Sequence, residues 1–134
     1  MPATELVKPG SSCISISRAV FSMPGVPATP GAVQLAWEDG SHTVVDVNAD
    51  WTLSIGHGLW VDPLGGVDNA DFGKWTLAAV GARDPLAEVA GSVVVSTSIR
   101  LNEVGELNGI DIAFDRGVLR LRVWEGDLAA EFAT

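Results

Sequence analysis

The sequence is poor in cysteine and in long apolar segments. Cys13 is the only cysteine among the 134 residues, so no internal disulfide can form. This cysteine usage is typical of proteins from a reducing compartment. No apolar run approaches the roughly 18–20 residues that cross a bilayer, and the first dozen residues lack the apolar segment of a signal peptide. We therefore predict a cytoplasmic protein without a membrane partner.

Basic residues are also scarce. Eight lysines and arginines stand against 17 aspartates and glutamates, which gives a formal net charge of -9 at pH 7. This charge repels nucleic acid and anionic lipid, and the sequence has no basic patch of the kind that binds either. Two interpretations of the acidity stay open: it attracts a basic protein partner, or it only keeps the protein soluble.

Residues suited to catalysis and metal binding are few. His42 and His57 are the only histidines, and nothing in the sequence places either beside Cys13, as a thiol nucleophile would require. The sequence contains no Gly-x-Ser-x-Gly motif, phosphate-binding loop or dinucleotide fingerprint. The carboxylates of residues 62–71 do not have the spacing of an EF-hand calcium loop. We expect no catalytic residue, cofactor or metal, and the sequence favours a non-enzyme without deciding the point.

What the sequence does contain is an internal repeat. Residues 32–40 align without a gap with residues 109–117, and at the same offset Asp50 falls on Asp127. Each copy consists of an alternating strand, a glycine-containing turn, a second strand, an acidic corner and a short apolar run. The pattern predicts pseudo-repeats near 32–55 and 109–132, each built on a β-hairpin.

A chain of this length is expected to form one domain. Residues 1–12 predict a flexible arm, and residues 13–134 predict a single β-rich domain. The predicted fold is mainly β, α+β at most, with about eight short antiparallel strands arranged as a sandwich or a partly open barrel. Outside the repeats, the patterns predict a strand over 13–21, a loop over 23–31, an irregular segment over 56–73, strands over 74–80 and 92–101, and one short helix near 84–90 that begins at Asp84 and Pro85.

The alternation of apolar and polar residues also predicts how the two hairpins pair. A two-residue turn determines which residues stand opposite each other and which face of each strand is buried. The predicted turns, Asp39–Gly40 and Arg116–Gly117, give the pairs Leu35 with Val44, Ile112 with Leu121, and Asp111 with Arg122.

One part of the chain is similar to known proteins. The segment Leu101–Gly105 followed by Gly109–Gly117, together with the Asp84–Gly91 helix before a strand, resembles a pattern found in small bacterial proteins of unknown function. Some similar β-rich proteins are encoded beside polymorphic toxins and act as their immunity proteins. The resemblance covers roughly the last third to half of the chain and rests on turns and strands. It implies a binding protein, and it assigns no catalytic residues.

Aromatic and acidic residues outside the predicted core are the candidate binding residues. Trp37, Trp51 and Trp75 fall on strand positions and are predicted to be buried, whereas Trp60 and Trp124 are the exceptions. Exposed tryptophans beside carboxylates are typical of protein–protein surfaces, although a loop tryptophan can also fold onto the core. The glycines around His57 let a backbone approach a bound group, or mark an ordinary strand-to-loop transition. The candidate binding residues are His57, Trp60, Asp62, Asp68, Asp71, Trp124, Glu125 and Asp127.

Three functions from different classes fit these features. The first is a small cytosolic protein-binding module, for example an immunity-type inhibitor that blocks a basic toxin with an acidic surface. The second is a small-molecule-binding or enzymatic β-barrel that uses the 56–71 loop. The third is a homodimeric structural protein that pairs through an open hairpin edge. The charge and the missing catalytic motifs favour the first.

Overall fold

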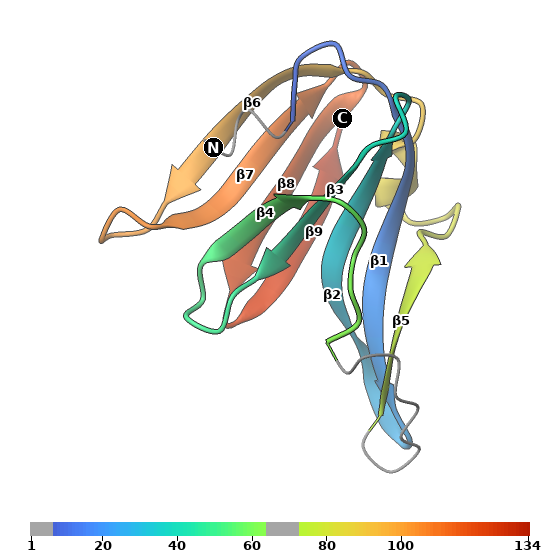
Figure 1. Ribbon diagram of the computed structural model, residues 1–134, viewed down its shortest axis with the longest axis vertical. Helices are drawn as coiled ribbons and strands as arrows, with labels where there is room; N and C mark the ends of the chain where they lie inside the picture. The colour runs from blue at the N-terminus through green and yellow to red at the C-terminus, as the bar shows by residue number, and fades with distance from the viewer. Residues whose placement is uncertain (1–6, 64–72) are drawn as a thin grey trace.

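Two antiparallel sheets make up the protein (Figure 1). The computed structural model describes residues 7–63 and 73–134. The first sheet has five strands in the order β4-β3-β2-β1-β5, and the second has four in the order β6-β7-β8-β9. The predicted mainly-β fold is therefore confirmed. The elements are β1 (Cys13–Met23), β2 (Val26–Trp37), β3 (His42–Val47), β4 (Leu53–His57), β5 (Lys74–Ala79), the 3₁₀ helix η2 (Pro85–Val89), β6 (Val94–Leu101), β7 (Leu107–Phe114), β8 (Gly117–Trp124) and β9 (Asp127–Ala133).

The sheets are joined along one side. Ser12 and Val93 form an antiparallel bridge just before β1 and β6 begin. Nearby, the backbone N–H of Gly10 donates to the carbonyl of Val94 at 2.8 Å. Beyond this bridge, no strand of one sheet pairs with a strand of the other within the described residues. The molecule is therefore a sandwich of two sheets and not a closed barrel.

The core lies between the two sheets. Successive strand residues point to opposite faces, and the inward residues of both sheets, such as Leu35 of β2 and Ile112 of β7, belong to one buried cluster. Burying a side chain of this size contributes about 1.5–3 kcal/mol. Val7 joins the cluster from the segment for which the sequence predicts an arm, and residues 1–6 of that segment lie outside the described residues.

The short helix predicted near 84–90 is confirmed, as the 3₁₀ helix η2. Its first N–H groups have no partner inside the helix, which is where a capping side chain helps. Asp84 supplies the cap, because its carboxylate accepts a hydrogen bond from the N–H of Leu86 at 3.0 Å. Leu86 and Val89 are buried and attach η2 to the core.

The two copies of the sequence repeat occupy corresponding places in the two sheets. Residues 32–55 form the second half of β2 together with β3 and β4, and residues 109–132 form most of β7 together with β8 and β9. Each copy is a three-stranded meander in which neighbours in the chain are also neighbours in the sheet. Each meander therefore has a second hairpin turn, between its second and third strands. This turn is at residues 48–52 in one copy and 124–127 in the other.

The first hairpin pairs one residue away from the predicted register. Its loop is one residue longer than expected, since the N–H of Trp37 donates to the carbonyl of Ser41 at 2.9 Å. Leu35 consequently stands opposite Thr43 and not Val44. A shift of one residue exchanges the faces of a strand, so Thr43 is buried. Its hydroxyl accepts a hydrogen bond from Nε1 of Trp37 at 2.8 Å, which satisfies both polar groups.

The second hairpin pairs two residues away from the predicted register. Its turn is Asp115–Arg116, with Phe114 opposite Gly117, so Ile112 stands opposite Leu119 and not Leu121. A shift of two residues keeps every side chain on its expected face. Ile112 and Leu121, which the sequence predicts on the inward face, are both buried.

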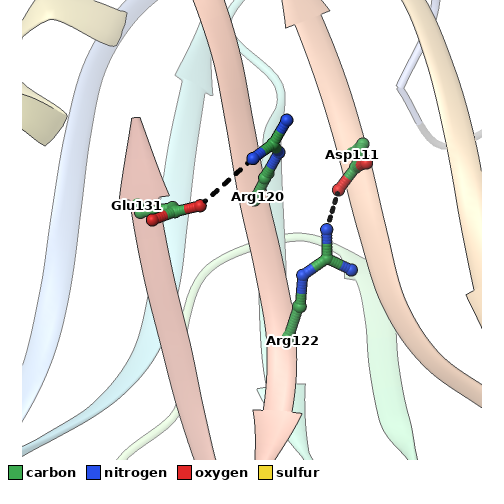
Figure 2. A network of polar contacts seen from close by, with 4 residues as sticks. All are labelled: Asp111, Arg120, Arg122 and Glu131. Carbon is green, nitrogen blue, oxygen red and sulfur yellow. Dashed lines mark hydrogen bonds and ion pairs between the residues drawn. The ribbon is translucent and has the colours of Figure 1, made fainter. Parts of the chain in front are cut away.

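The outer face of this hairpin carries two ion pairs (Figure 2). Asp111 stands opposite Arg120, but its carboxylate reaches diagonally to Arg122, with an N–O distance of 3.1 Å. Arg120 turns to Glu131 of β9, at 3.4 Å. Ion pairs with this degree of solvent access contribute about 0–1 kcal/mol each. This polar face therefore adds little stability, and it helps to fix which residues of the two strands pair.

The loop predicted over residues 23–31 is wrong, because residues from Val26 onward belong to β2. The prediction relied on the three prolines and two glycines of this stretch, and prolines such as Pro27 and Pro30 cannot donate to a neighbouring strand. In the structure β3 pairs only with residues 33–36 of β2, so the first part of β2 is bordered by β1 alone. Proline is compatible with a strand that has one open edge.

Candidate functional site

The second turns of the two meanders lie next to each other (Figure 1). Trp51 is in the β3–β4 turn and Gly126 is in the β8–β9 turn. Nε1 of Trp51 lies 3.0 Å from the position that a Cβ atom on Gly126 would take. A larger residue at 126 would displace the indole, so the glycine permits the close approach of the two turns. We call residues 48–52 and 124–127 the hairpin-tip surface.

Two exposed tryptophans mark this surface. Trp37 is buried as predicted, but the prediction that Trp51 and Trp75 are core residues is wrong: Trp51 is 59% exposed and Trp75 is half-buried. Trp124, a predicted exception, is 68% exposed. The sequence prediction treated Trp51 as the first residue of a strand, whereas it occupies a turn before β4 begins.

The backbone of the hairpin-tip surface is unusual. Trp51 has a φ of 64° and Glu125 a φ of 50°, and these are the two non-glycine residues with positive φ in the described ranges. A bulky side chain in this region is disfavoured by contact with its own backbone. Such conformations persist where surrounding structure or function maintains them.

The same surface is acidic. Asp50, Glu125 and Asp127 are exposed on the two turns. The hydroxyl and N–H of Thr52 donate to the carboxylate of Asp50 at 2.6 and 3.1 Å. These hydrogen bonds lower the pKa of Asp50 below its ordinary value, so it stays ionised at neutral pH. Aromatic and acidic groups are thus presented together.

A cavity of about 350 Å³ opens beside the hairpin-tip surface. It lies where β3 ends and β9 begins, next to the part of the β1–β2 ribbon that extends past β3. Aromatic rings and carboxylates both contribute to its wall. We call it the aromatic cavity, and its lining residues include Phe21, Gly31, Asp46, Trp60, Pro63, Trp75, Asp127 and Leu128.

Three aromatic rings form one part of the cavity wall. Phe21 of β1 stands opposite Trp75 of β5, and their ring centroids are 5.2 Å apart. The ring of Trp60 also lies near Trp75, at a centroid distance of 6.3 Å. A Cβ atom on Gly31 would stand 2.7 Å from Cζ3 of Trp75, so the glycine leaves the space that this indole occupies.

A buried glutamine fixes the position of Trp60. Gln34 is only 8% exposed, and its Oε1 accepts a hydrogen bond from the backbone N–H of Trp60 at 2.7 Å. An unpaired buried amide would cost free energy, and the contact avoids this cost for both groups. The segment after β4 is thereby attached to the central strand β2.

Two carboxylates form the acidic part of the cavity wall. Asp46, near the end of β3, is half-buried and accepts a hydrogen bond from the N–H of Val47 at 2.8 Å. Asp127, the first residue of β9, is exposed. The two aspartates come from different sheets, so only the folded sandwich brings them to one cavity.

Arg18 lies behind the cavity wall and connects the two sheets. Its Nε donates to the carbonyl of Gly31 at 3.2 Å, and its Nη2 donates to the carbonyl of Leu128 in β9. Burial lowers the pKa of Arg18, and the nearby charge of Asp84 opposes that effect. The guanidinium therefore links β1 and β2 of the first sheet to β9 of the second sheet through backbone carbonyls.

The structure brings some of the predicted binding residues together and separates others. Trp60 and Asp127 line the same cavity. Trp124 and Glu125 lie on the adjacent hairpin-tip surface. His57 is exposed at the end of β4 and is not among the described residues that line the cavity.

The remaining predictions concern the segment after β4. Asp62 is half-buried in the same short stretch as Trp60 and Pro63. Asp68 and Asp71 lie outside the described residues.

Four residues of the site were not predicted from the sequence: Phe21, Asp46, Trp51 and Trp75. Phe21 and Trp75 are far apart in the chain, and only the β1–β5 pairing makes them neighbours. Asp46 interrupts the apolar run of β3 between Val45 and Val47, and this charged residue in an apolar strand could have identified it as a candidate. No local pattern distinguished Trp51 from a core tryptophan.

The described residues offer little for covalent or metal chemistry. In the ranges 7–63 and 73–134 no three histidine, cysteine or carboxylate side chains are grouped to hold a metal ion. Cys13 is fully buried, and burial raises the pKa of its thiol to about 11. The thiolate is the reactive form of cysteine, so Cys13 is an unreactive thiol at neutral pH.

Comparison of the chain with protein-family models, curated proteins and solved structures finds no match. Within the described part of the chain, no helix has the length and apolar character needed to cross a membrane.

Proposed function

We propose that this protein is a small cytosolic module that binds a basic protein, and that it acts as an immunity-type inhibitor by covering the functional surface of that partner. The observation that carries the proposal is the pairing of Trp51 and Trp124 with carboxylates on the adjoining hairpin turns. Tryptophan is the residue type most enriched among interface residues that dominate affinity. Here two of them are exposed on one surface.

The charge of the chain supports a basic partner. A formal net charge of -9 over 134 residues attracts a basic protein at long range and accelerates its association. The carboxylates of Asp50, Glu125 and Asp127 place part of this charge directly beside the tryptophans. Complementary charge then orients the partner, and the buried aromatic rings supply most of the affinity.

The strained backbone of the hairpin-tip surface also supports the proposal. A glycine at position 51 would adopt the positive φ without strain, yet the residue there is a large aromatic. Strain of about 1–3 kcal/mol at a single residue is typical of functional positions. A binding role accounts for a tryptophan at this position, because the indole lies over Gly126 and still leaves the residue 59% exposed to a partner.

Capture of the partner tests the proposed function. The tagged protein is incubated with a lysate of the organism that encodes it and washed at about 50 mM and then about 300 mM salt, where screening shortens the range of charge interactions. We expect one basic protein, captured stoichiometrically and released mainly in the second wash. An unrelated protein of similar negative charge is the control for general binding of basic proteins. A captured set identical to that of the control, or no captured protein, would contradict the proposal.

A second candidate function, self-association, is favoured by a separate observation. β6 is an edge strand of the second sheet, and Ile99 and Leu101 on it are 44% and 55% exposed. An exposed apolar edge strand can pair with the same strand of another copy about a two-fold axis. This candidate predicts a concentration-dependent dimer in sedimentation equilibrium, which Ile99→Lys disrupts. A constant monomer mass over the accessible concentration range would exclude it.

A further inference from the structure

We infer that the aromatic cavity binds an arginine side chain of the partner. The inference rests on the proposed function and deepens it, because it identifies the chemical group that the partner inserts. It depends on the combination of three rings and two carboxylates around one space of about 350 Å³. Neither feature alone would specify a ligand.

The rings make the cavity suitable for a cation. The face of an aromatic ring carries a negative quadrupole, which attracts a cation within about 6 Å of the ring centroid, and tryptophan is the strongest of the aromatic residues in this respect. Trp60 and Trp75 both line the cavity, and Phe21 packs against Trp75. Gly31 leaves the space that the Trp75 indole occupies, and Gln34 fixes the backbone of Trp60, so this part of the wall is in place before any ligand arrives and little ordering is required on binding.

The carboxylates determine the sign of the ligand charge. Asp46 and Asp127 contribute negative charge from opposite sheets. Arg18 is a positive group behind the wall, and two of its donors already bond to the carbonyls of Gly31 and Leu128. Arg18 does not itself line the cavity. A cation in a half-enclosed space also interacts with carboxylates more strongly than it would in water.

Arginine fits this cavity better than lysine. Its guanidinium is flat, stacks on aromatic faces and can donate two parallel hydrogen bonds to a carboxylate. The ammonium of lysine is compact and strongly hydrated, and it gains less from flat rings. The cavity volume is near the lower end of ligand pockets, which span about 300–1,000 Å³. A space of this size takes a long side chain and not a large cofactor.

The test uses small probes on the full chain. N-acetyl-arginine amide is titrated at low salt while nuclear magnetic resonance follows the indole N–H signals of Trp60, Trp75 and Trp124. The citrulline analogue, which has the same shape and no charge, and the lysine analogue are titrated in parallel. We expect saturable shifts of the Trp60 and Trp75 signals with the arginine probe, and about tenfold weaker binding of both other probes. Equal binding of either analogue would overturn the inference.

Matched variants locate the probe. Asp46→Asn keeps an oxygen that can accept from the N–H of Val47, and Asp127→Asn keeps the size of the side chain. Each is expected to weaken the arginine probe about three- to tenfold. Glu103→Gln removes an equal charge from the exposed β6–β7 turn and should change binding less than about twofold. An unchanged affinity in both aspartate variants would contradict the inference, and a thermal melt of each variant verifies its fold.

Failure of the inference and failure of the proposed function give different results. If a basic partner is captured but Asp46→Asn and Asp127→Asn bind it as tightly as wild type, the cavity assignment is wrong and the proposed function stands. If the arginine probe binds as expected but no partner is captured, the cavity recognises the guanidinium group and the proposed function is wrong.

Discussion

Replacing Arg18 with methionine is expected to lower the free energy of unfolding by about 3 kcal/mol. The guanidinium donates to carbonyls of Gly31 in β2 and Leu128 in β9, so it connects the two sheets in addition to the Ser12–Val93 bridge. Hydrogen bonds from a charged donor contribute about 1.5–3 kcal/mol each. In the variant, water that bonds to the two carbonyls would recover part of the lost free energy. Methionine keeps an apolar stem of similar length, so the loss reports on the polar contacts. Urea unfolding measures it.

The control for Arg18 is Arg100→Met on the exposed face of the β6 edge. Surface substitutions of this kind change stability by about 0.5 kcal/mol or less. The slope of the unfolding free energy with urea should be the same for both variants and wild type, which indicates that the extent of unfolding is unchanged. A loss below about 0.5 kcal/mol for Arg18→Met would show that the contacts with Gly31 and Leu128 do not hold the sheets together.

Replacing Trp51 with glycine is expected to weaken partner binding by about 30-fold, which corresponds to about 2 kcal/mol for a residue that dominates an interface. The same change removes the positive-φ strain of a bulky residue, and this gain offsets the lost contact of the indole with Gly126. The stability of the free protein should therefore change by less than about 1 kcal/mol. Titration calorimetry measures the affinity, and thermal unfolding measures the stability.

Two comparisons sharpen the test of Trp51. Trp124→Ala should also weaken binding by about 30-fold, because Trp124 lies on the adjoining turn. Val104→Ala, at a residue that is 77% exposed on the β6–β7 turn, should leave the affinity within about twofold of wild type. If Trp51→Gly destabilises the fold by more than about 2 kcal/mol and binds normally, the tryptophan is a structural residue of the turn.

The sequence predicted the second hairpin better than the first for a physical reason. In 109–123 one face is apolar and the other carries Asp111, Arg120 and Arg122, so the buried face is determined even though the turn was placed one residue away and the pairing shifted by two. In the first hairpin both faces carry apolar residues, because segments after β4 cover the outer face near Gln34. The pattern could not detect the extra loop residue there, and the faces of β3 were exchanged.

The site was less predictable than the fold, because it depends on contacts between distant segments. Trp60 and Asp127 were candidates for separate reasons, and only the folded sandwich places them around one cavity. Trp75 was assigned to the core because it falls on a strand. A strand position alone does not show whether the face that carries the side chain is covered. Loop tryptophans and acidic turns can be recognised in a sequence. Which residues lie beside them in the folded protein depends on the order of the strands in the sheets.

Hydrogen exchange of the complex with the captured partner identifies the surface that binds. Binding is expected to slow exchange at residues 46–60 and 124–128, which include both hairpin turns and the strand ends around the aromatic cavity. Exchange at the β6–β7 turn, residues 101–107, should stay unchanged. Slower exchange confined to β6 and its turn, with the two hairpin turns unaffected, would contradict the account and assign binding to the edge of the second sheet.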